Sequence, residues 1–494
     1  MNSRFGWIGR SANTLQFNAV PDAAAAASVP QRAAPDPADG PARPLARGGR
    51  SLRERLAATL RQQPEALTPR ALRRTLGELQ AIIDPHVSEV EGGRRAKALA
   101  AWYAAAPLEE RRDFWLLISE QFVADQVQAK AAQAQYAAAV GTAEEAVAEV
   151  RLRRATVSPR RRLLQRFSVY PEGIRFLVDL RAEMLPHLKS DKRLLALDVE
   201  MEYMFSTWFD VAFLDLRRIS WDSPASLIEK LIRYEAVHDI RSWDDVKNRL
   251  DSDRRCYGFF HPRLPDEPLI FVEVALMDGI AGSITPLLDE TAAPANLATA
   301  TTAIFYSISN TQSGLRGVSF GDSLIKRVVE TLKAEFPRLK VFAALSPIPG
   351  FRPWLQKNAS AMLGQLGEKP RAGLGRAVSP AKLSPDALLA MLDKPLGFDA
   401  RSPLRQFLLA CAAHYLGREW QQGKPADPVA RFHLGNGARV ERLNWAGDPS
   451  AKGLKQSYGL MVNYLYDLNR LERHRSQLAQ GKIPISGAIE ELYF

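Results

Sequence analysis

The sequence predicts a multidomain protein in which an all-helical bundle is followed by a mixed α/β domain. Its 494 residues exceed what one hydrophobic core usually holds. The first part repeats apolar residues at helical spacing, and after Asp210 short β-branched and aromatic runs alternate with amphipathic helices. We therefore expect a helical domain over 51–209 and an α/β domain over 210–494.

The composition is that of an ordinary globular protein with excess positive charge. Hydrophobic residues make up 46% and the formal net charge is +11, so an anionic partner is expected. No run approaches the roughly 18 apolar residues of a membrane span, and no nucleic-acid-binding signature accompanies the charge. We predict neither a membrane nor a nucleic-acid partner. The histidines and the two cysteines lack zinc-site spacing, so no metal site is expected.

Residues 1–50 are expected to form a flexible leader. The stretch 21–50 is dominated by Ala, Pro, Gly and Arg and has few large apolar side chains to bury. The first twenty residues contain arginine but no clear amphipathic helix, so no targeting address is predicted. The Ala and Arg bias of the chain suggests a bacterial, cytoplasmic protein.

The helical domain is predicted from its apolar spacing and its prolines. Phe114, Leu117 and Ile118 recur at three- and four-residue spacing, which is typical of the buried face of a helix. Prolines interrupt the region repeatedly, so several packed helices are expected rather than one long rod. No convergent set of chemical groups stands out, and the expected role is scaffolding and self-association as a homo-oligomer.

The α/β domain is predicted from four strand-like runs. They are Arg255 to Phe260, Leu269 to Met277, Ala303 to Ser309 and Leu339 to Leu345. Between the last two, Ser323 to Phe336 has one apolar helical stripe, so strand, turn, helix and strand form a βαβ unit. A helical insertion is expected near 363–418, before strand-like and loop segments around His433 and from Tyr458 to Tyr466.

The connection from Asn310 to Asp322 contains three glycines directly before the predicted helix. Glycines let backbone N–H groups approach a ligand, and a helix N-terminus has partial positive charge, so the turn suits a pyrophosphate. An ordinary strand-to-helix loop with Asp322 or Ser323 as N-cap has the same pattern. The residues from Arg316 to Gly321 resemble the coenzyme A turn of the GNAT-type acetyltransferase fold, with Ser319 in place of the inner glycine.

Several segments together resemble the malonyl-CoA decarboxylase family. They are YEAVHDIRSW at Tyr234 to Trp243, RRCYGFFHP, EPLIFVEVAL, AIFYSISNTQSGLRGV, LIKRVVETLKAEFP, LSPIPGF at Leu345 to Phe351, FHLGNGA at Phe432 to Ala438 and GLMVNYLY at Gly459 to Tyr466. The likeness runs from about Asp210 to Tyr466. The order and spacing of the segments, more than any one of them, are the basis of the resemblance. It implies a helical domain for oligomer contacts, a GNAT-like catalytic domain, malonyl-CoA as substrate and a place in fatty acid or malonate metabolism.

The resemblance also implies the residues of the active site. Ser346 in LSPIPGF and His433 in FHLGNGA correspond to the catalytic pair, and Tyr466 in NYLY matches a further active-site tyrosine. In a strand, Tyr464 and Tyr466 would share one face. The acyl-CoA binding turn corresponds to Arg316, Gly317, Val318, Ser319, Phe320, Gly321 and Asp322. Ser319 replaces the family's usual acid, so no role of that acid carries over.

The chemistry of decarboxylation suits a hydroxyl and an imidazole. Loss of carbon dioxide leaves a thioester enolate, which hydrogen-bond donors stabilise, and a proton must then reach the α-carbon. These steps require no metal or organic cofactor, and none is predicted. Pro347 favours an extended Ser346 at a strand end. We expect His433 to act as proton donor and carbonyl partner while Ser346 polarises or relays; a turn serine and a core histidine are the structural alternatives.

Two other functions fit the same coenzyme A turn. A GNAT-type N-acyltransferase would need a base for the incoming amine, and Glu273 on a predicted strand is the candidate. A non-catalytic acyl-CoA sensor would bind malonyl-CoA without turnover. Dependence on an added amine would indicate the acyltransferase, and binding without release of carbon dioxide would indicate the sensor.

Overall fold

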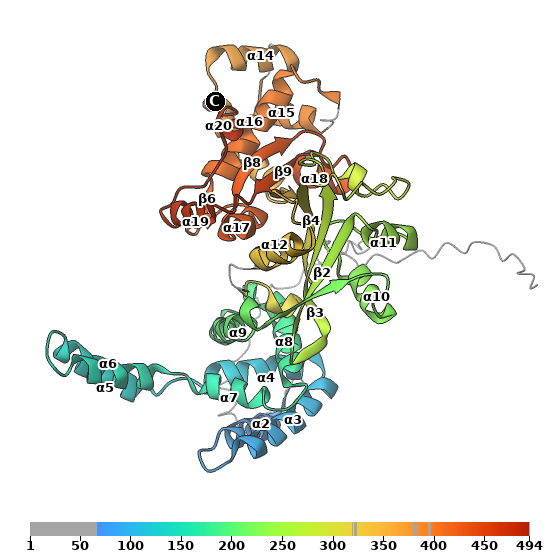
Figure 1. Ribbon diagram of the computed structural model, residues 1–494. Coiled ribbons are helices and arrows are strands. Elements are labelled where there is room, and N and C mark those ends of the chain that lie inside the picture. Colours follow the sequence, from blue (N-terminus) through green and yellow to red (C-terminus); the bar gives the residue numbers. More distant parts are fainter. Residues whose placement is uncertain (1–66, 319, 321–323, 379–382, 394–396, 494) are drawn as a thin grey trace, which may run out of the picture. The chain divides into compact units, whose positions relative to one another are not determined.

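The computed structural model of the protein describes residues 67–318, 320, 324–378, 383–393 and 397–493 (Figure 1). The predicted leader over 1–50, the predicted helical domain up to residue 66, and Ser319, Gly321 and Asp322 of the predicted turn lie outside the described residues. The chain divides into two compact units. One contains the described residues up to Thr207 with Gln312–Val318, and the other contains Trp208–Thr311 with the described residues from 320 onward.

The first unit is helical, as predicted. Its helices are α2 (Pro69–Ile82), α3 (Glu89–Ala105), α4 (Leu108–Gln121), α5 (Gln126–Ala139), α6 (Glu145–Thr156), α7 (Pro159–Phe167), α8 (Gly173–Met184) and α9 (Leu195–Trp208). Pro69 and Pro159 stand in the first turns of α2 and α7, where a missing N–H costs nothing. Phe114 is fully buried on α4, and its ring centroid lies 5.2 Å from that of Tyr103 and 6.5 Å from that of Phe167. The core of this unit therefore includes a cluster of aromatic rings among its aliphatic side chains.

Helices α5 and α6 form a hairpin and lie side by side (Figure 1). Gly141 turns the chain between them with a positive φ of 80°. Ala132 is the buried residue of α5 and Ala148 that of α6. Valines are exposed on both helices, including Val127 at 78% and Val150 at 48%. Within the described part of the chain, the hairpin thus leaves apolar side chains exposed.

The second unit contains a seven-stranded mixed sheet. In sheet order the strands are β1 (Asp215–Ile219), β2 (Arg254–His261), β3 (Leu264–Met277), β4 (Thr302–Asn310), β5 (Val341–Pro347), β9 (Met461–Leu465) and β8 (Arg439–Asn444). Neighbours are antiparallel except β4 and β5, which are parallel and joined through α12 (Leu324–Glu335). The four predicted strands, the βαβ unit and the mixed α/β architecture are confirmed.

The parallel strands β4 and β5 are paired over only part of their lengths. Their register runs from Thr302 opposite Val341 to Phe305 opposite Ala344. Beyond these residues β4 continues its pairing with β3 and β5 continues its pairing with β9. The sheet therefore divides at this point, and the end of β5 is free of β4.

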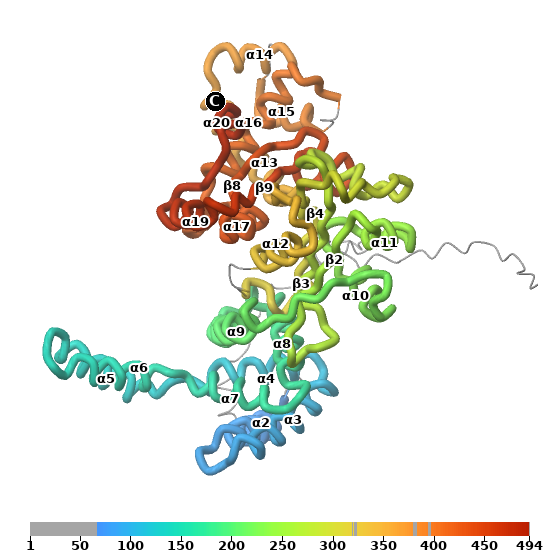
Figure 2. Tube along the Cα trace, in the orientation of Figure 1, coloured from blue at the N-terminus to red at the C-terminus, as the bar shows by residue number. Residues whose placement is uncertain are grey.

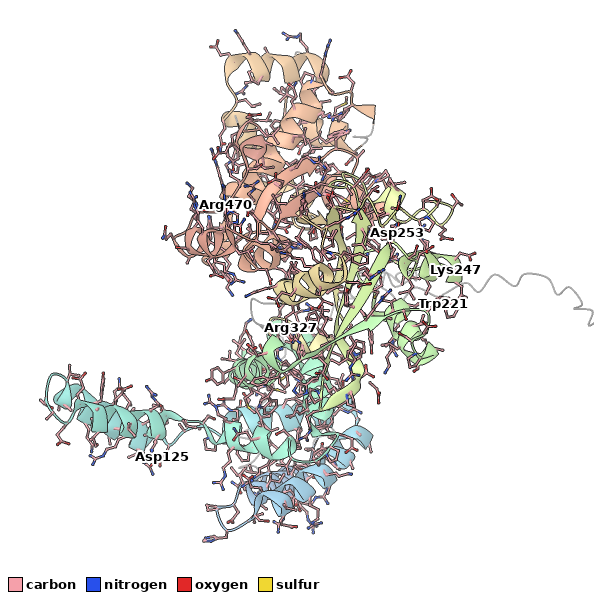
Figure 3. All side chains as sticks on the ribbon, in the orientation of Figure 1. Asp125, Trp221, Lys247, Asp253, Arg327 and Arg470 are labelled. Atoms are coloured by element: carbon pink, nitrogen blue, oxygen red, sulfur yellow. The ribbon has the colours of Figure 1, made fainter. Side chains whose placement is uncertain are left out.

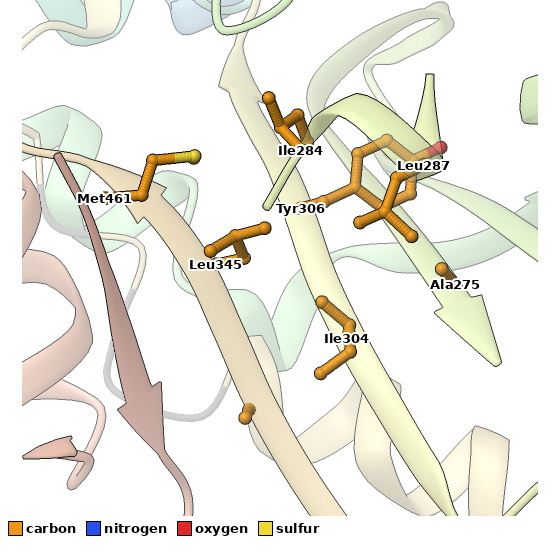
Figure 4. Packing of buried hydrophobic residues seen from close by; sticks show 8 residues of the cluster. Ala275, Ile284, Leu287, Ile304, Tyr306, Leu345 and Met461 are labelled. Atoms are coloured by element: carbon orange, nitrogen blue, oxygen red, sulfur yellow. The ribbon is translucent and has the colours of Figure 1, made fainter. Parts of the chain in front are cut away.

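Two apolar clusters pack on the sheet. One joins β3, β4, β5 and β9 to the segment after β3 (Figure 4), through Ala275, Ile284, Leu287, Ile304, Tyr306, Ala343, Leu345 and Met461. The other joins β1, β2 and β3 to α10 (Ala225–Tyr234) and α11 (Trp243–Arg249), through Ile219, Ile228, Leu231, Ile240, Val246, Cys256 and Phe271. In the described ranges no helix has the length and hydrophobicity needed to cross a membrane.

The chain after β5 is largely helical (Figure 2). Its elements are α13 (Phe351–Gly364), α14 (Glu368–Val378), α15 (Pro385–Leu392), α16 (Pro403–Arg418), the hairpin of β6 (Trp420–Gln421) and β7 (Lys424–Pro425), α17 (Pro428–Gly435), α18 (Ala451–Ser457), α19 (Leu471–Ala479) and α20 (Gly487–Glu490). The strand-like or loop structure predicted around His433 is wrong, because that residue lies on α17. The strand-like prediction for Tyr458 to Tyr466 is met by β9.

Candidate active site

Ser346 lies near the end of β5, where that strand no longer pairs with β4. It is opposite Val462 of β9 and is 5% exposed. Its neighbour Leu345 points into the apolar cluster of Figure 4, so strand alternation places Ser346 on the opposite face of the sheet. Pro347 follows and favours the extended backbone at this position. The predicted place of Ser346 at a strand end is confirmed.

His433 lies on α17, a helix with a strong N-terminal signal. The Asp427 carboxylate accepts hydrogen bonds from two backbone N–H groups of the first turn at 2.9 and 3.0 Å, and Pro428 begins the helix. The His433 side chain is buried, and its imidazole stacks on the Tyr464 ring with centroids 4.4 Å apart and planes at 20°. The imidazole is therefore fixed both by its helix and by an aromatic ring.

The three predicted catalytic side chains meet in one chain of hydrogen bonds. The Ser346 hydroxyl oxygen lies 2.9 Å from Nε2 of His433, and Nδ1 of His433 lies 2.6 Å from the hydroxyl oxygen of Tyr466. The residues come from β5, α17 and the segment directly after β9. All three are buried. This geometry supports one connected site. It does not favour the alternative interpretation of Ser346 as a turn serine and of His433 as an unrelated core histidine.

Tyr464 and Tyr466 contact the same imidazole in different ways. Tyr464 stacks on His433, and its hydroxyl has no hydrogen-bond partner in the described part of the chain. Tyr466 bonds to Nδ1 through its hydroxyl. The predicted shared face of the two tyrosines is confirmed. Asn463, between them, donates to the carbonyls of Ala281 and Ala344, so its amide is occupied within the fold.

The site is uncharged at neutral pH. Burial lowers the pKa of His433 from 6.5 to about 3, because the imidazolium form would lose its hydration. Burial likewise raises the pKa of Tyr466 and of Tyr464 well above the ordinary value. The imidazole therefore has one N–H, and both phenols keep their protons. The chain of hydrogen bonds can donate and relay protons without carrying a formal charge.

This arrangement differs from a serine hydrolase triad in its third member. In such a triad a buried carboxylate stabilises the imidazolium that forms when histidine takes the serine proton. Here the group at Nδ1 is the neutral Tyr466, and no charged group shifts the pKa of His433. Ser346 is consequently poorly supported as a nucleophile. The geometry favours donation of a hydrogen bond from Ser346 to a ligand oxygen.

Asp427 links the segment after Ser346 to the helix that bears His433. Besides capping α17, its carboxylate accepts from the Gly350 N–H at 3.3 Å and lies 3.5 Å from the Tyr415 hydroxyl. A Cβ at Gly350 would approach that hydroxyl to 2.1 Å, so glycine is needed there. Burial raises the pKa of Asp427 to about 6. This residue was not predicted, although an aspartate directly before a proline is a helix-start signal.

The predicted coenzyme A turn is described only in part. Arg316, Gly317 and Val318 belong to the helical unit, where the buried Arg181 donates to the carbonyls of Gly314 and Arg316 at 2.7 and 3.0 Å. Gly317 has a φ of +82°, which favours glycine. The Arg316 side chain is exposed. A cradle for pyrophosphate stays a prediction, because its inner residues lie outside the described ranges.

The second part of the turn belongs to the α/β unit. Phe320 is buried, and its carbonyl accepts from the Val211 N–H at 2.9 Å. Arg327, one turn into α12 (Figure 3), donates to the carbonyls of Val211 and Leu214 at 2.6 and 2.5 Å. Arg327 therefore holds the backbone before β1, while Lys326 is exposed.

Glu273, the candidate base of the acyltransferase alternative, is a structural residue. It is fully buried on β3 and pairs with the equally buried Arg249 at 2.8 Å. Arg249 also bonds to Asp245 at 2.7 Å. Burial raises the pKa of Glu273 to about 7. A carboxyl group without solvent access and held by an arginine is not placed to take a proton from an incoming amine.

Comparison with known proteins gives one consistent family. The sequence profile of the malonyl-CoA decarboxylase C-terminal domain matches residues 212–493, and that of the N-terminal domain matches 122–209. A mitochondrial malonyl-CoA decarboxylase from Rattus norvegicus is 39% identical over 343 residues, covering 65% of this chain and 68% of the relative. A counterpart from Anser anser anser is 38% identical over 332 residues, covering 63% of this chain and 65% of the relative. The chain thus spans about two thirds of the length of these relatives.

Solved structures give the same answer. The malonyl-CoA decarboxylase of Rhodopseudomonas palustris is 41% identical, with a TM-score of 0.73 over 85% of this chain and 99% of that one. The malonyl-CoA decarboxylase of Cupriavidus metallidurans is 43% identical, with a TM-score of 0.71 over 86% of this chain and 100% of that one. The relatives from Rattus norvegicus and Anser anser anser are mitochondrial proteins by name, whereas these two solved structures are of bacterial proteins.

We predict that His433 stays neutral far below the usual range. In 15N-histidine NMR of the folded protein, its ring signals should not titrate between pH 8 and about 4, because its pKa is lowered to about 3. Between pH 6.5 and about 3 the unfolded chain binds this proton and the folded chain does not, so stability falls as pH falls. A His433→Gln variant assigns the signal. Protonation of His433 near pH 6 would contradict the burial argument.

We also predict that Asp427→Ala destabilises the α/β unit. The change removes a helix cap and leaves the Gly350 N–H unsatisfied, which should cost about 2 kcal/mol in urea unfolding. It should also shift the ring signals of His433. Asp427→Asn is the matched control, because an amide oxygen can still accept from the first turn. A free energy of unfolding of the alanine variant equal to that of the parent would show that the cap and the link are unimportant.

Proposed function

The chain belongs to the malonyl-CoA decarboxylase family, and from this premise we propose that it converts malonyl-CoA to acetyl-CoA and carbon dioxide. The observation that carries the proposal is the uncharged chain of hydrogen bonds from Tyr466 through His433 to Ser346. Such a chain can stabilise charge on a thioester oxygen and deliver a proton. Those are the two tasks that decarboxylation of a thioester sets.

The direction of the chain follows from its hydrogens. Tyr466 and Ser346 each have one hydroxyl hydrogen, and a neutral imidazole has one N–H. Among the described residues neither hydroxyl has a partner other than His433. When Tyr466 donates to Nδ1, the Nε2–H donates to Ser346, and the Ser346 hydrogen is left for the substrate. Every donor then has an acceptor, so this direction is the one we propose.

The reaction then proceeds with the thioester oxygen accepting the hydrogen bond of Ser346. The bond between the α-carbon and the carboxylate breaks, its electron pair moves into the thioester, and carbon dioxide leaves. Ser346, supported by His433, stabilises the resulting enolate oxygen. The α-carbon takes a proton relayed along the chain and replaced from water, which gives acetyl-CoA. His433 thus acts through Ser346 on the oxygen, which reverses the roles expected from the sequence, where His433 was the carbonyl partner. The scheme needs no metal or organic cofactor.

The acyl-CoA is proposed to bind through the turn from Arg316 to Asp322. Support comes from the exposed side chain of Arg316, the left-handed Gly317 and the position of the turn before α12. A cytoplasmic location and a role in malonate or fatty acid metabolism complete the proposal. They rest on composition and on the family.

We predict that purified protein releases carbon dioxide from malonyl-CoA without added metal or amine. Ser346→Ala should lower kcat by roughly 100- to 1000-fold, since it removes the donor to the oxyanion. Tyr466→Phe should lower kcat about tenfold by removing the bond that fixes the imidazole tautomer. The assay is release of labelled carbon dioxide under saturating substrate.

Tyr464→Phe is the matched control for the Tyr466 variant. Its ring still stacks on His433, and the hydroxyl that it loses has no partner in the described part of the chain. Full activity of Tyr464→Phe beside a loss in Tyr466→Phe would support the relay. Equal activity of Tyr464→Phe and Tyr466→Phe would exclude a role of Tyr466 in the proton relay. Binding of malonyl-CoA without release would indicate a sensor, and release only with an amine would indicate an acyltransferase.

Self-association is proposed to use the hairpin of α5 and α6. The hairpin exposes valines on both helices and buries one alanine on each. Exposed apolar side chains on two adjacent helices are typical of a surface that packs against another pair of helices. A second copy of this chain is the partner that the predicted homo-oligomer requires.

We expect Val127→Lys with Val150→Lys to produce a smaller species in analytical ultracentrifugation. The proposed association would bury both valines, so replacing them by charged side chains should weaken it by at least about tenfold. Gln128→Lys with Gln133→Lys is the charge-matched control on α5, and it should leave the assembly unchanged. An unaltered sedimentation coefficient for the valine variant would exclude the hairpin as the interface.

A further inference from the structure

A basic pocket lies in the α/β unit, separate from Ser346, His433 and Tyr466. Its volume is about 150 Å³, and the ionisable residues of its lining are Arg439, Arg470, Arg473, His474, Lys482 and Glu490. The residues come from β8, from α19 and its N-cap position, from the segment that follows α19, and from α20. Figure 3 labels Arg470 at the start of α19. None of the residues assigned so far to catalysis or to the coenzyme A turn lines this pocket.

Ordered elements hold the basic side chains in place. Arg470, Arg473 and Gln477 recur at three- and four-residue spacing, so they share one side of α19. His474, on the same helix, is buried, and its Nδ1 donates to the Gly437 carbonyl at 2.9 Å. This bond fixes α19 against the start of β8, where Arg439 lies. The pocket is built on a helix and a strand rather than on mobile side chains alone.

The segment after α19 closes the other side of the pocket. Gly481 reverses the chain with a φ of +77°. The Val440 N–H then donates to the Pro484 carbonyl at 2.9 Å, so residues 482–485 lie beside β8. Lys482 is brought to the pocket in this way.

The charges of the pocket are unbalanced. Four cations line it against the single carboxylate of Glu490. Arg439 pairs with Glu441 at 2.6 Å and Arg470 pairs with Asp467 at 3.4 Å. Over the described ranges Arg473 and Lys482 have no ion-pair partner.

Converging like charges repel one another, and this cost is offset when an anion binds between them. The free guanidinium of Arg473 and ammonium of Lys482 are therefore available to a ligand. A monocarboxylate has two acceptor oxygens, whereas a phosphate group has more and can accept from the Arg473 guanidinium and the Lys482 ammonium at the same time. Guanidinium groups match phosphate oxygens in pairs, and a lysine adds a point charge.

We propose that this basic pocket is a phosphate-binding site. Phosphate has two possible sources. One is the nucleotide part of the acyl-CoA substrate, and this source rests on the proposed function. The other is a separate phosphorylated small molecule.

The test is isothermal titration calorimetry of the full chain with adenosine 3′,5′-bisphosphate and with inorganic pyrophosphate. Arg473→Ala with Lys482→Ala should weaken binding by about tenfold or more, because two charge-assisted contacts are lost. Lys247→Ala with Lys455→Ala removes the same charge from exposed positions outside the pocket and should change affinity less than about twofold. Both pairs are exposed, so folding should be retained, as a thermal melt will show. Equal affinities of parent and pocket variant for both probes would overturn the proposal.

Kinetics separate the two sources. If the pocket holds the 3′-phosphate of the substrate, the pocket variant raises KM for malonyl-CoA and leaves KM for its 3′-dephospho analogue unchanged. If it holds the pyrophosphate, both KM values rise. If it holds a separate molecule, both KM values stay unchanged while the calorimetric loss remains. Calorimetry needs no turnover, so absence of decarboxylation would refute the proposed function and leave the pocket to be judged by binding alone.

Discussion

The antiparallel pairing of β5 with β9 sets the geometry on which the site depends. Ser346 lies opposite Val462, and the Tyr466 N–H donates to the Phe342 carbonyl at the other end of the pair. Ser346 lies four positions after Phe342 on β5, which is about 13 Å of extended chain. The Tyr466 side chain covers part of that length and brings its hydroxyl toward Ser346. The imidazole of His433, stacked on Tyr464, joins the two hydroxyls through hydrogen bonds of 2.9 and 2.6 Å.

That requirement explains why α17 is held so firmly. An imidazole that is hydrogen-bonded at both nitrogens tolerates little movement of its helix. The hydrogen bonds of 2.9 and 2.6 Å would be weakened if the helix shifted. Asp427 fixes the start of α17 and the turn after Ser346 with one carboxylate. Burying an acid here raises its pKa to about 6, so the link is obtained at a cost in desolvation. Gly350 also belongs to this link, because a Cβ at this position would clash with the Tyr415 hydroxyl.

Local patterns in the sequence predicted what local forces decide. The β-branched runs predicted β2 to β5, Pro347 predicted the extended Ser346, and the two-residue spacing predicted the shared face of Tyr464 and Tyr466. The helix under His433 was missed because its glycines resemble a loop, while its Asp-Pro start was overlooked. The role of Asp427 in joining two segments, and the attachment of Gln312–Val318 to the helical unit by Arg181, depend on tertiary contacts. No pattern along one segment reports such contacts.

An uncharged site has a consequence for the proposed reaction. Malonyl-CoA would bring a carboxylate next to groups that offer it no positive charge, since burial alone shifts the pKa of His433. An anion that loses its water without gaining a cation is raised in free energy, and leaving as neutral carbon dioxide relieves this. The charge that remains spreads over the enolate, whose oxygen meets the hydroxyl of Ser346. Cations are useful where phosphate must be held, as in the basic pocket, and harmful beside the bond that breaks. The proposed arrangement keeps neutral donors beside the reacting carbons and places arginines elsewhere. Cations can then strengthen the binding of the phosphate groups without stabilising the carboxylate that leaves as carbon dioxide.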